Sequence, residues 1–284
     1  MTTATAFVPS RFQLTRHSDT FWRVTFDNGP LNLIDGQMNL ELHQLLDLVE
    51  QDDQLAVVLF DSNNPDYFLA HYAADADMSP LDALEPKQAT PWLHWATFLV
   101  RLSKSPAVTI TALRGRARAA GSEFALATDI RFASRERGVL GQFEVALGVI
   151  PGGAPSTRLA GLVGRGRAFE IVLGGEDFDG DLAERYGYVN RAIPDAEFVE
   201  FVDAYAQRVS RFDRRALGDI KGFINAASLP DDIAVMAEMR AFGEAVPREP
   251  ATRLIPAAFQ AGWGQPGDFE LHLGTRIAEV TATD

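Results

Sequence analysis

A glutamate beside a helix start is the first feature of this sequence that could do chemistry. Glu123 lies in LRGRARAAGSEFALATDI, residues 113–130, where a strand-like run leads through small residues into a helix expected to begin near Ala119 or Ala120. The first amides of a helix have no partner within it and carry the positive end of its dipole, so they could stabilise an oxyanion. Glu123 follows Ala120 by three residues and projects from roughly the same side of the helix. We therefore expect an anion-binding amide and a carboxylate to face one site.

A purely structural interpretation of this segment is also open. Alanine and glycine allow close helix packing, and an acidic residue in the first turn of a helix is stabilised by the helix dipole. Since the chain contains no cysteine, disulfide bonds, thiolate nucleophiles and cysteine metal sites are excluded. Any nucleophile or base must therefore be another residue type.

Apolar patterns predict the elements that would hold such a site. Short β-branched or aromatic runs bounded by turn residues predict strands, and apolar residues at helical spacing predict helices. The predicted strands are 21–26, 55–61, 108–113 and 130–134, and the predicted helices between them are 35–50 and 91–104. In the second helix, Trp92 and Trp95 belong to an aromatic stripe that we interpret as core rather than as a ligand site.

Beyond residues 189–193 the pattern changes. Segments 195–211, 216–227 and 231–243 are consecutive helical patterns without a convincing strand. Alternating strands and helices followed by helices alone indicate an α/β core with a helical appendage. We therefore predict a core with the active site at residues 1–194, and a helical C-terminal region for packing and oligomerisation at residues 195–284.

Composition and charge limit the classes of partner. The chain has 284 residues, 46% of them hydrophobic, and a formal net charge of −13. This acidity argues against nucleic-acid binding, because polyanions would be repelled. No apolar run approaches the roughly 18–20 residues that span a bilayer, and the start of the chain lacks a basic segment followed by an apolar one. We expect a cytoplasmic protein that does not bind membranes.

Three segments follow one another in an order that is found in one enzyme family. They are DYFLAHYAAD at residues 66–75, LRGRARAAGSEFALATDIRFAS at 113–134 and GQFEVALGVIPGGAPSTRLAGLVG at 141–164. Their order and approximate spacing, over residues 20–195, resemble those of the enoyl-CoA hydratase/isomerase (crotonase) superfamily. The resemblance implies an α/β fold with a crotonase-type ββα spiral core and a C-terminal helical region.

The resemblance assigns roles to individual residues. It places Glu123 and Glu144 on the two catalytic glutamates, and Tyr72 and Ala120 on the residues whose amides form the oxyanion hole. It implies contacts with the coenzyme A part of the substrate for a further set, which is Leu31, Leu33, Ala70, Tyr72, Ala73, Ala74 and Asp75. Coenzyme A is thus expected as part of the substrate, and no separate cofactor or metal is expected. For Glu144, a structural role as the partner in a loop salt bridge stays open.

These groups together could hydrate a conjugated thioester. Two amides polarise the thioester carbonyl, and a preorganised donor of this kind is worth about 10²–10³ in rate. The glutamates then activate water at the β carbon and deliver a proton to the α carbon, each step contributing roughly 10²–10⁴. Two carboxylates crowded in a closed pocket cannot both ionise cheaply, so the pKa of one should rise and make it the acid. The implied activity is the addition of water to a 2-enoyl-CoA, as in fatty acid metabolism.

Several residues near this site depart from the family pattern. His71 replaces the glycine before the first oxyanion amide, and its imidazole could enter the pocket or serve packing alone. Ala119 and Ala120 replace two glycines and would narrow the approach to the second amide. Arg116 and Arg118 could meet a carboxylated acyl group, and a solvated or intersubunit salt bridge is the alternative. We expect a substrate whose shape differs from that of ordinary hydratase substrates.

The end of the chain departs most from the family. Residues 256–274, PAAFQAGWGQPGDFELHLG, lack the Lys–Arg cluster with which the family commonly supports the coenzyme A phosphates. We therefore expect acyl-CoA to bind weakly, with Arg253 as a partial substitute for the cluster. The helical region resembles the part of crotonases that packs against neighbouring subunits, which implies a homotrimer or homohexamer.

Other activities stay open at the level of the sequence. The same two glutamates could move one proton between carbons in an acyl-CoA double-bond isomerase, or the site could hydrolyse a β-diketone or an acyl thioester. A non-catalytic acyl-ligand-binding protein would result if the altered oxyanion hole no longer supported turnover. A metal hydrolase built from His71, Asp75 and Asp77 is disfavoured, because that spacing matches no common ligand set.

Overall fold

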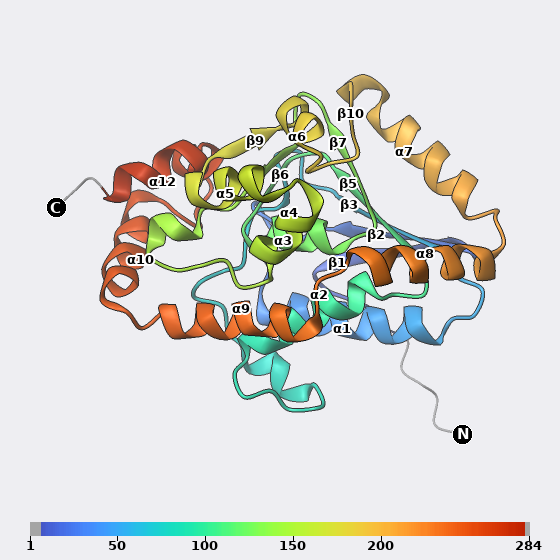
Figure 1. The fold of residues 1–284 in the computed structure, drawn as a ribbon, viewed down its shortest axis with the longest axis horizontal. Coiled ribbons are helices and arrows are strands. Elements are labelled where there is room, and N and C mark those ends of the chain that lie inside the picture. Colours follow the sequence, from blue (N-terminus) through green and yellow to red (C-terminus); the bar gives the residue numbers. More distant parts are fainter. Residues whose placement is uncertain (1–6, 282–284) are drawn as a thin grey trace.

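Two β-sheets form the centre of the structure, a computed structural model that describes residues 7–281 (Figure 1). The first sheet has the strand order β1-β2-β3-β5-β7-β10, in which β1 and β2 pair antiparallel and the following neighbours pair parallel. Its strands are Phe12–Ser18, Phe21–Phe26, Val57–Ser62, Val108–Leu113, Ile130–Ser134 and Arg191–Ile193. The second sheet, in the order β4-β6-β8-β9, consists of Tyr67–Leu69, Arg116–Arg118, Val139–Gly141 and Asp177–Asp179.

A strand–strand–helix unit recurs along the core. Each of β3, β5 and β7 in the first sheet is followed by a short strand of the second sheet, which is β4, β6 or β8, and then by a helix. The three helices are α2 (Trp92–Ser103), α3 (Ala120–Ala127) and α4 (Pro155–Leu162). Within these units, β3, β5 and β7 pair in parallel in the first sheet, as β4, β6 and β8 do in the second. This repetition is the predicted ββα spiral.

Buried aromatic rings fix α3 in the middle of the core. The side chain of Phe124 is fully buried, and its ring lies 5.0 Å from the ring of Phe60, 5.4 Å from Phe26 and 5.9 Å from Phe98, measured between centroids. These partners come from β3, β2 and α2. Since neighbouring residues of a helix point in different directions, an anchored Phe124 also sets the direction of Glu123.

The remaining helices surround this core. Before residue 194 they are α1 (Gly36–Gln51), α5 (Arg165–Gly174) and α6 (Gly180–Tyr186), together with 3₁₀ turns at Ser79–Ala83 and Glu144–Leu147. After it they are α7 (Asp195–Val209), α8 (Arg214–Ser228), α9 (Asp232–Ala245), α10 (Glu249–Ala261), α11 (Asp268–Leu271) and α12 (Leu273–Thr281).

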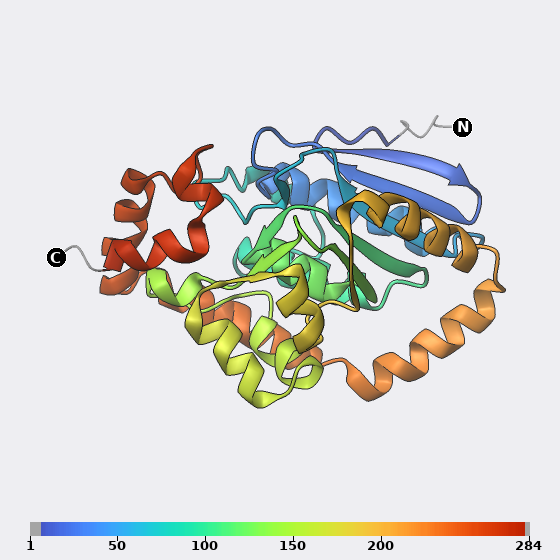
Figure 2. The ribbon, with the colours of Figure 1, turned by 90° about the horizontal axis from the view of Figure 1, so that it is seen from above.

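The helices after residue 194 occupy both ends of the molecule. Figure 1 and Figure 2 show α7 and α8 at one end and α10 to α12 at the other, with α9 running between them. Val235 and Met239 of α9 belong to the main core cluster, beside residues of α2 and α3. The helical region is thus packed onto the core through α9, and also through α7, which contacts β3, β7 and β10.

The structure confirms the predicted fold class. The strands predicted at 21–26, 108–113 and 130–134 match β2, β5 and β7 residue for residue. The predicted helices 35–50 and 91–104 correspond to α1 and α2. Residues 1–6 and 282–284, at the outer ends of the two predicted regions, lie outside the described residues. No helix between residues 7 and 281 is both long and apolar enough to cross a membrane.

Candidate active site

A cavity of about 220 Å³ brings together two glutamates from different segments of the sequence. Aromatic side chains such as Trp92, Phe143 and Phe242 form much of its wall, and the carboxyl groups of Glu123 and Glu144 lie in that wall. Both glutamates are buried, with only 3% and 7% of their surface exposed. A mostly apolar cavity with a few convergent polar groups is the usual form of a small-molecule site.

Glu123 is held by two hydrogen-bond donors. Its Oε1 accepts from the Gly153 N–H at 2.6 Å and its Oε2 from the Trp95 indole N–H at 2.9 Å. Burial raises the pKa of Glu123 from 4.5 to about 7, while these two donors act in the opposite direction and limit the rise. A Cβ on Gly153 would lie 2.3 Å from Oε2 of Glu123, so the glycine makes room for the carboxyl group. Glu123 can therefore change its charge near neutral pH.

Glu144 is held by a neighbouring amide. When the side-chain nitrogen of Gln142 faces Glu144, it donates to both carboxyl oxygens at 3.0 and 3.2 Å, and the Gln142 oxygen accepts from the Ser122 hydroxyl. Burial, and next the charge of Glu123, raises the pKa of Glu144 well above 4.5. Within residues 7–281 no cation pairs with Glu144, so the alternative role in a loop salt bridge is not found.

The loop after β4 presents a backbone amide at this cavity. The Ile34 N–H donates to His71 C=O at 2.9 Å, and the Ala73 N–H donates to Ile34 C=O at 2.8 Å. Residue 72 therefore pairs with residue 34 as in a parallel bridge, and its own N–H points away from that partner. Tyr72 lines the cavity, and in the described part of the chain its N–H donates no hydrogen bond.

The start of α3 supplies a second amide. The Ala119 N–H donates to Gly141 C=O, whereas the Ala120 N–H, the first of the helix, has no partner among residues 7–281. Ala119 has φ +48° and ψ −122°, a backbone conformation that favours glycine and costs a residue with a side chain roughly 1–3 kcal/mol. Alanine thus occupies the strained position, and both Ala119 and Ala120 line the cavity.

His71 also reaches the cavity wall. Its ring is 2% exposed and packs against the rings of Phe143 and Trp263, with centroid distances of 5.9 and 5.2 Å. The φ of His71 is not in the left-handed region, so a side chain is tolerated here without the strain that the family's glycine suggested.

Arg116 and Arg118 are directed elsewhere and do not line the cavity. Arg118 is fully buried and forms a two-pronged ion pair with Asp177, with both distances 2.7 Å. Both arginines also donate to Leu271 C=O, and Arg118 donates to Glu270 C=O. The salt bridge of Arg118 is therefore within the chain, neither solvated nor between subunits, and both residues fasten α11 to the core.

The residues expected to contact coenzyme A fall into two groups. Those that line the cavity are Tyr72, Ala73 and Ala74, and those that do not are Leu31, Leu33, Ala70 and Asp75. Leu31 and Ala70 are buried in a small cluster that Leu271 of α11 covers, whereas Asp75 is exposed. The surface formed by Leu31 and Ala70 is thus closed over by the C-terminal region.

Several residues of the site were not predicted from the sequence. The aromatic stripe belongs to the core cluster, as interpreted, but Trp92 and Trp95 also line the cavity and Trp95 contacts Glu123. Gln142 and the C-terminal Trp263 are further additions. The only sequence signal for Gln142 is its place two residues before Glu144, and the loop that carries Trp263 has no pattern of its own.

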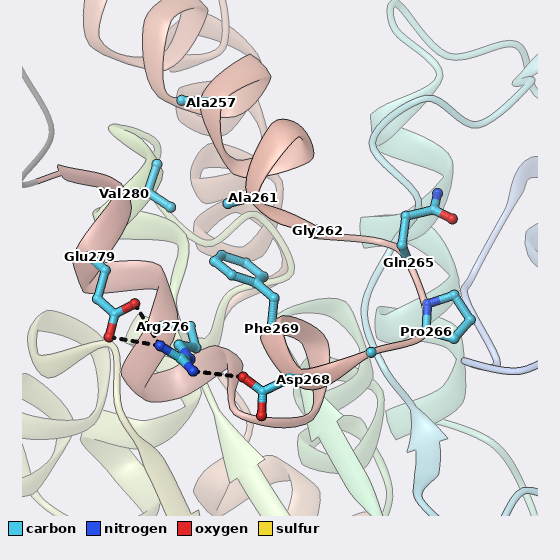
Figure 3. A pocket seen from close by; sticks show the side chains of 11 residues that line it. Ala257, Ala261, Gly262, Gln265, Pro266, Asp268, Phe269, Arg276, Glu279 and Val280 are labelled. Carbon is cyan, nitrogen blue, oxygen red and sulfur yellow. Dashed lines mark hydrogen bonds and ion pairs between the residues drawn. The ribbon is translucent and has the colours of Figure 1, made fainter.

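A second hollow lies at the C-terminal end. It has a volume of about 600 Å³ and is lined by residues of α10 to α12 and the loop between them, as Figure 3 shows. Arg276 pairs there with Asp268 at 2.7 Å and with Glu279 at 3.1 Å. None of the predicted site residues lines it, so the cavity with the two glutamates is the candidate active site.

Comparisons with known proteins point to one family. The family model described as enoyl-CoA hydratase/isomerase matches residues 16–248. A Streptomyces avermitilis structure, provisionally described as an enoyl-CoA hydratase, is 42% identical with a TM-score of 0.89, covering 96% of this chain and 98% of that one. An enoyl-CoA hydratase structure from Geobacillus kaustophilus is 28% identical with a TM-score of 0.69, covering 89% and 95%.

A third structure shares the fold at lower identity. The enoyl-CoA hydratase structure from Mycobacterium avium subsp. paratuberculosis is 22% identical with a TM-score of 0.78, covering 92% of this chain and 99% of that one. The family match over most of the sequence, together with the 42% identity to the Streptomyces protein, establishes the family as well as the fold. The chain belongs to the enoyl-CoA hydratase/isomerase family.

Proposed function

We propose that the protein is a hydro-lyase that adds water to the double bond of a 2-enoyl-CoA. The observation that carries the proposal is the pair of buried glutamates, whose pKa values are both raised, beside two backbone amides that have no hydrogen-bond partner among the described residues. Such a pair holds a proton at neutral pH and can act as base and acid together. The amides, at Tyr72 and Ala120, would accept the charge that develops on the thioester oxygen.

The two glutamates differ in a way that assigns their roles. Glu123 accepts two N–H bonds that favour its charged form, whereas the pKa of Glu144 is raised further by burial and by the charge of Glu123. Glu123 is therefore the base and Glu144 the acid.

In the proposed reaction, Glu123 takes a proton from water as the water oxygen bonds to the β carbon. The electron pair of the double bond moves toward the thioester oxygen, where the amides of Tyr72 and Ala120 stabilise it. Glu144 then gives its proton to the α carbon, which yields a 3-hydroxyacyl thioester. A proton passing from Glu123 to Glu144 restores the starting state.

Isomerisation of an acyl-CoA double bond is the second candidate. It is favoured by the same observation, because the ionised carboxyl group of the pair could take a proton from one carbon while the protonated one gives its proton to another. Hydration and isomerisation yield different products from one substrate, so product analysis distinguishes them. An acyl-ligand-binding protein without activity would give no product. A cytoplasmic location belongs to the same proposal.

The proposal is tested by turnover of crotonyl-CoA, followed by loss of the enoyl absorbance and by identification of the product. Glu123→Gln and Glu144→Gln should each lower kcat at least about 10²-fold, because both remove a group that transfers a proton. The exposed Glu197 of α7, changed to Gln, serves as the control. Wild-type activity in either glutamate variant would remove that residue from the mechanism, and no turnover by the wild type would exclude crotonyl-CoA hydration.

A further inference from the structure

A buried pair made by His71 and Glu270 joins the C-terminal region to the loop that carries the Tyr72 amide. The His71 Nε2 lies 3.2 Å from the Glu270 Oε1, and the two side chains are 2% and 0% exposed. Neither atom has a hydrogen-bond partner among residues 7–281, so the two groups face each other in close contact without a well-formed hydrogen bond. Glu270 belongs to α11, and the two residues are far apart in the sequence.

The hydrogen bonds around the pair determine where its protons lie. The His71 Nδ1 is 2.9 Å from Tyr72 C=O, and because a carbonyl can only accept, Nδ1 must carry a proton. A ring nitrogen without a proton, facing a carboxylate at 3.2 Å, would set two acceptors against each other. One proton therefore lies on Nε2 or on the facing carboxyl oxygen.

Glu270 is suited to this contact. Its Oε2 accepts from the Gly264 N–H at 2.9 Å. Although burial alone would raise the pKa of Glu270, the His71 ring and the Gly264 N–H lower it below its ordinary value. Arg118 also holds the backbone of α11 through Glu270 C=O. The carboxylate is thus fixed in place from several directions.

We propose that Glu270 is a positioning residue for the oxyanion pocket, because it orients the His71 imidazole that in turn holds the Tyr72 carbonyl. This inference rests on the proposed function, in which the Tyr72 amide binds the thioester oxygen. Two peptide units meet at residue 72, and three of their four polar groups are hydrogen-bonded, which are His71 C=O, Ala73 N–H and Tyr72 C=O. The fourth is the Tyr72 N–H.

The contribution of the histidine is specific to one of these groups. Ile34 donates to His71 C=O and accepts from the Ala73 N–H, so the peptide unit before Tyr72, which carries the Tyr72 N–H, is held at its carbonyl end only. The peptide unit after it is fixed on its second side by the imidazole. The two peptide units share the α carbon of Tyr72, so loosening the second lets the Tyr72 N–H turn. Since an oxyanion donor acts only when it is aligned with the developing charge, this loss of alignment should reduce catalysis more than substrate binding.

Kinetics with crotonyl-CoA test this through two variants of Glu270. Glu270→Leu removes the partner of the ring and should lower kcat at least about tenfold while KM changes less than about threefold, the pattern of an interaction made in the transition state. Glu270→Gln should keep kcat within about threefold, because its amide can donate to Nε2 and its oxygen can accept from Gly264. A purely structural role would not produce this rescue together with the split between kcat and KM.

The control is Asp268→Asn in the same short helix. Asp268 is exposed and pairs with Arg276, so this variant disturbs α11 without touching His71 and should leave kcat and KM unchanged. Equal kcat in Glu270→Leu and wild type, or an equal loss in Glu270→Leu and Glu270→Gln, would overturn the inference. Thermal unfolding of each variant shows that the compared proteins are folded.

Nitrogen NMR of the histidine rings gives a readout that does not depend on turnover. The His71 signal is assigned by its loss in His71→Asn. In the wild type Nδ1 should carry a proton, and Glu270→Gln should retain it there, whereas Glu270→Leu should shift protonation toward Nε2. An unprotonated Nδ1 in the wild type would overturn the inference even in an active enzyme. A wild type that keeps the Nδ1 proton but does not turn over enoyl-CoA would instead contradict the proposed function.

Discussion

The two glutamates of the cavity are poorly placed for stability and well placed for proton transfer. A buried carboxyl group without a cation costs free energy once it ionises, and both Glu123 and Glu144 lie in an apolar wall. The protein reduces this cost by keeping a proton on the pair, which is the proton that the proposed reaction uses. Stability and chemistry therefore depend on the same proton.

This dependence predicts how pH affects unfolding. The pKa of Glu144 is higher in the folded chain than the ordinary 4.5, so above about pH 4.5 the folded state binds more protons than the unfolded state. The stability that this group contributes is complete below that pH and is lost as pH rises, with a slope of up to about 1.4 kcal/mol per pH unit. Glu144→Gln should therefore gain stability over the wild type between pH 5 and pH 8.

Urea unfolding at both pH values measures the effect. Asp53→Asn, which changes an exposed carboxylate, is the control and should differ from the wild type by a similar amount at each pH. A stability difference between Glu144→Gln and wild type that stayed constant from pH 5 to pH 8 would show that Glu144 is ionised in the folded protein throughout.

At the scale of elements, the position of α3 depends on a backbone contact with β4. A Cβ on Gly121 would lie 1.9 Å from the Leu69 carbonyl oxygen, so the helix approaches the strand as closely as it does because this residue has no side chain. The contact sets the depth of the first turn of α3. It therefore also sets where the Ala120 amide and Glu123 lie relative to the loop of Tyr72.

Gly121→Ala should consequently push α3 away from β4. We expect a loss of about 3 kcal/mol or more in the free energy of unfolding, since the clash is with backbone that cannot rotate away, and a loss of turnover in the folded fraction. Gly161→Ala is the matched control, because Gly161 lies in α4 with no atom within 4 Å of an added Cβ. That control should be neutral or more stable by up to about 1 kcal/mol. Equal stability of the two variants would argue against the close contact.

Periodicity explains which elements the sequence predicts and which it does not. The long, apolar strands β2, β5 and β7 and the helices α1 and α2 have a clear pattern and match the structure. The strands of the second sheet have three residues each, too few to show alternation.

Among the site residues, Glu123 could be recognised from the sequence because its neighbours form a strand-to-helix turn. The partner of His71 could not be predicted, since nothing in the sequence links residues 71 and 270.

At the scale of the whole molecule, α8 presents an unusual apolar face. Ile220, Phe223 and Ile224 are 59%, 79% and 59% exposed, and their spacing places them on one side of the helix. Large exposed apolar groups of this kind mark interaction surfaces. We propose that this face packs against other copies of the chain in a homotrimer or homohexamer, as the family resemblance implies.

Light scattering at micromolar concentration tests the assembly. The wild type should have three or six times the chain mass of 31.1 kDa, and Phe223→Asp should lower the mass toward that of one chain. Val8→Asp changes another exposed apolar residue, away from α8, and should leave the mass unchanged. A wild type that remained a single chain would contradict the proposal.

The affinity for the nucleotide part of coenzyme A depends on the basic residues of the C-terminal segment. The C-terminal segment lacks a basic cluster, and Arg253 lies 3.4 Å from Glu249 within α10. Each missing charge-assisted contact forfeits about 1.5–3 kcal/mol. We therefore expect acyl-CoA to bind weakly, and acyl-pantetheine, which lacks the nucleotide, to lose less affinity than it would in an ordinary hydratase. Calorimetric titration with both ligands measures the difference, and a loss of several decades in affinity without the nucleotide would show that other residues hold the phosphates.

The position of the last helices at the end of the sequence determines when the pocket can be completed during synthesis. A ribosome delivers both sheets and the two glutamates before it delivers Trp263 and Glu270, and domains begin to fold as they emerge. Until α10 and the loop with Trp263 arrive, the pocket lacks part of its wall and water can reach the carboxylates. Hydrated carboxylates ionise at neutral pH, so no proton is stored for catalysis. Under the proposed mechanism, an unfinished chain should therefore be inactive, and activity should begin only after its last helices have docked.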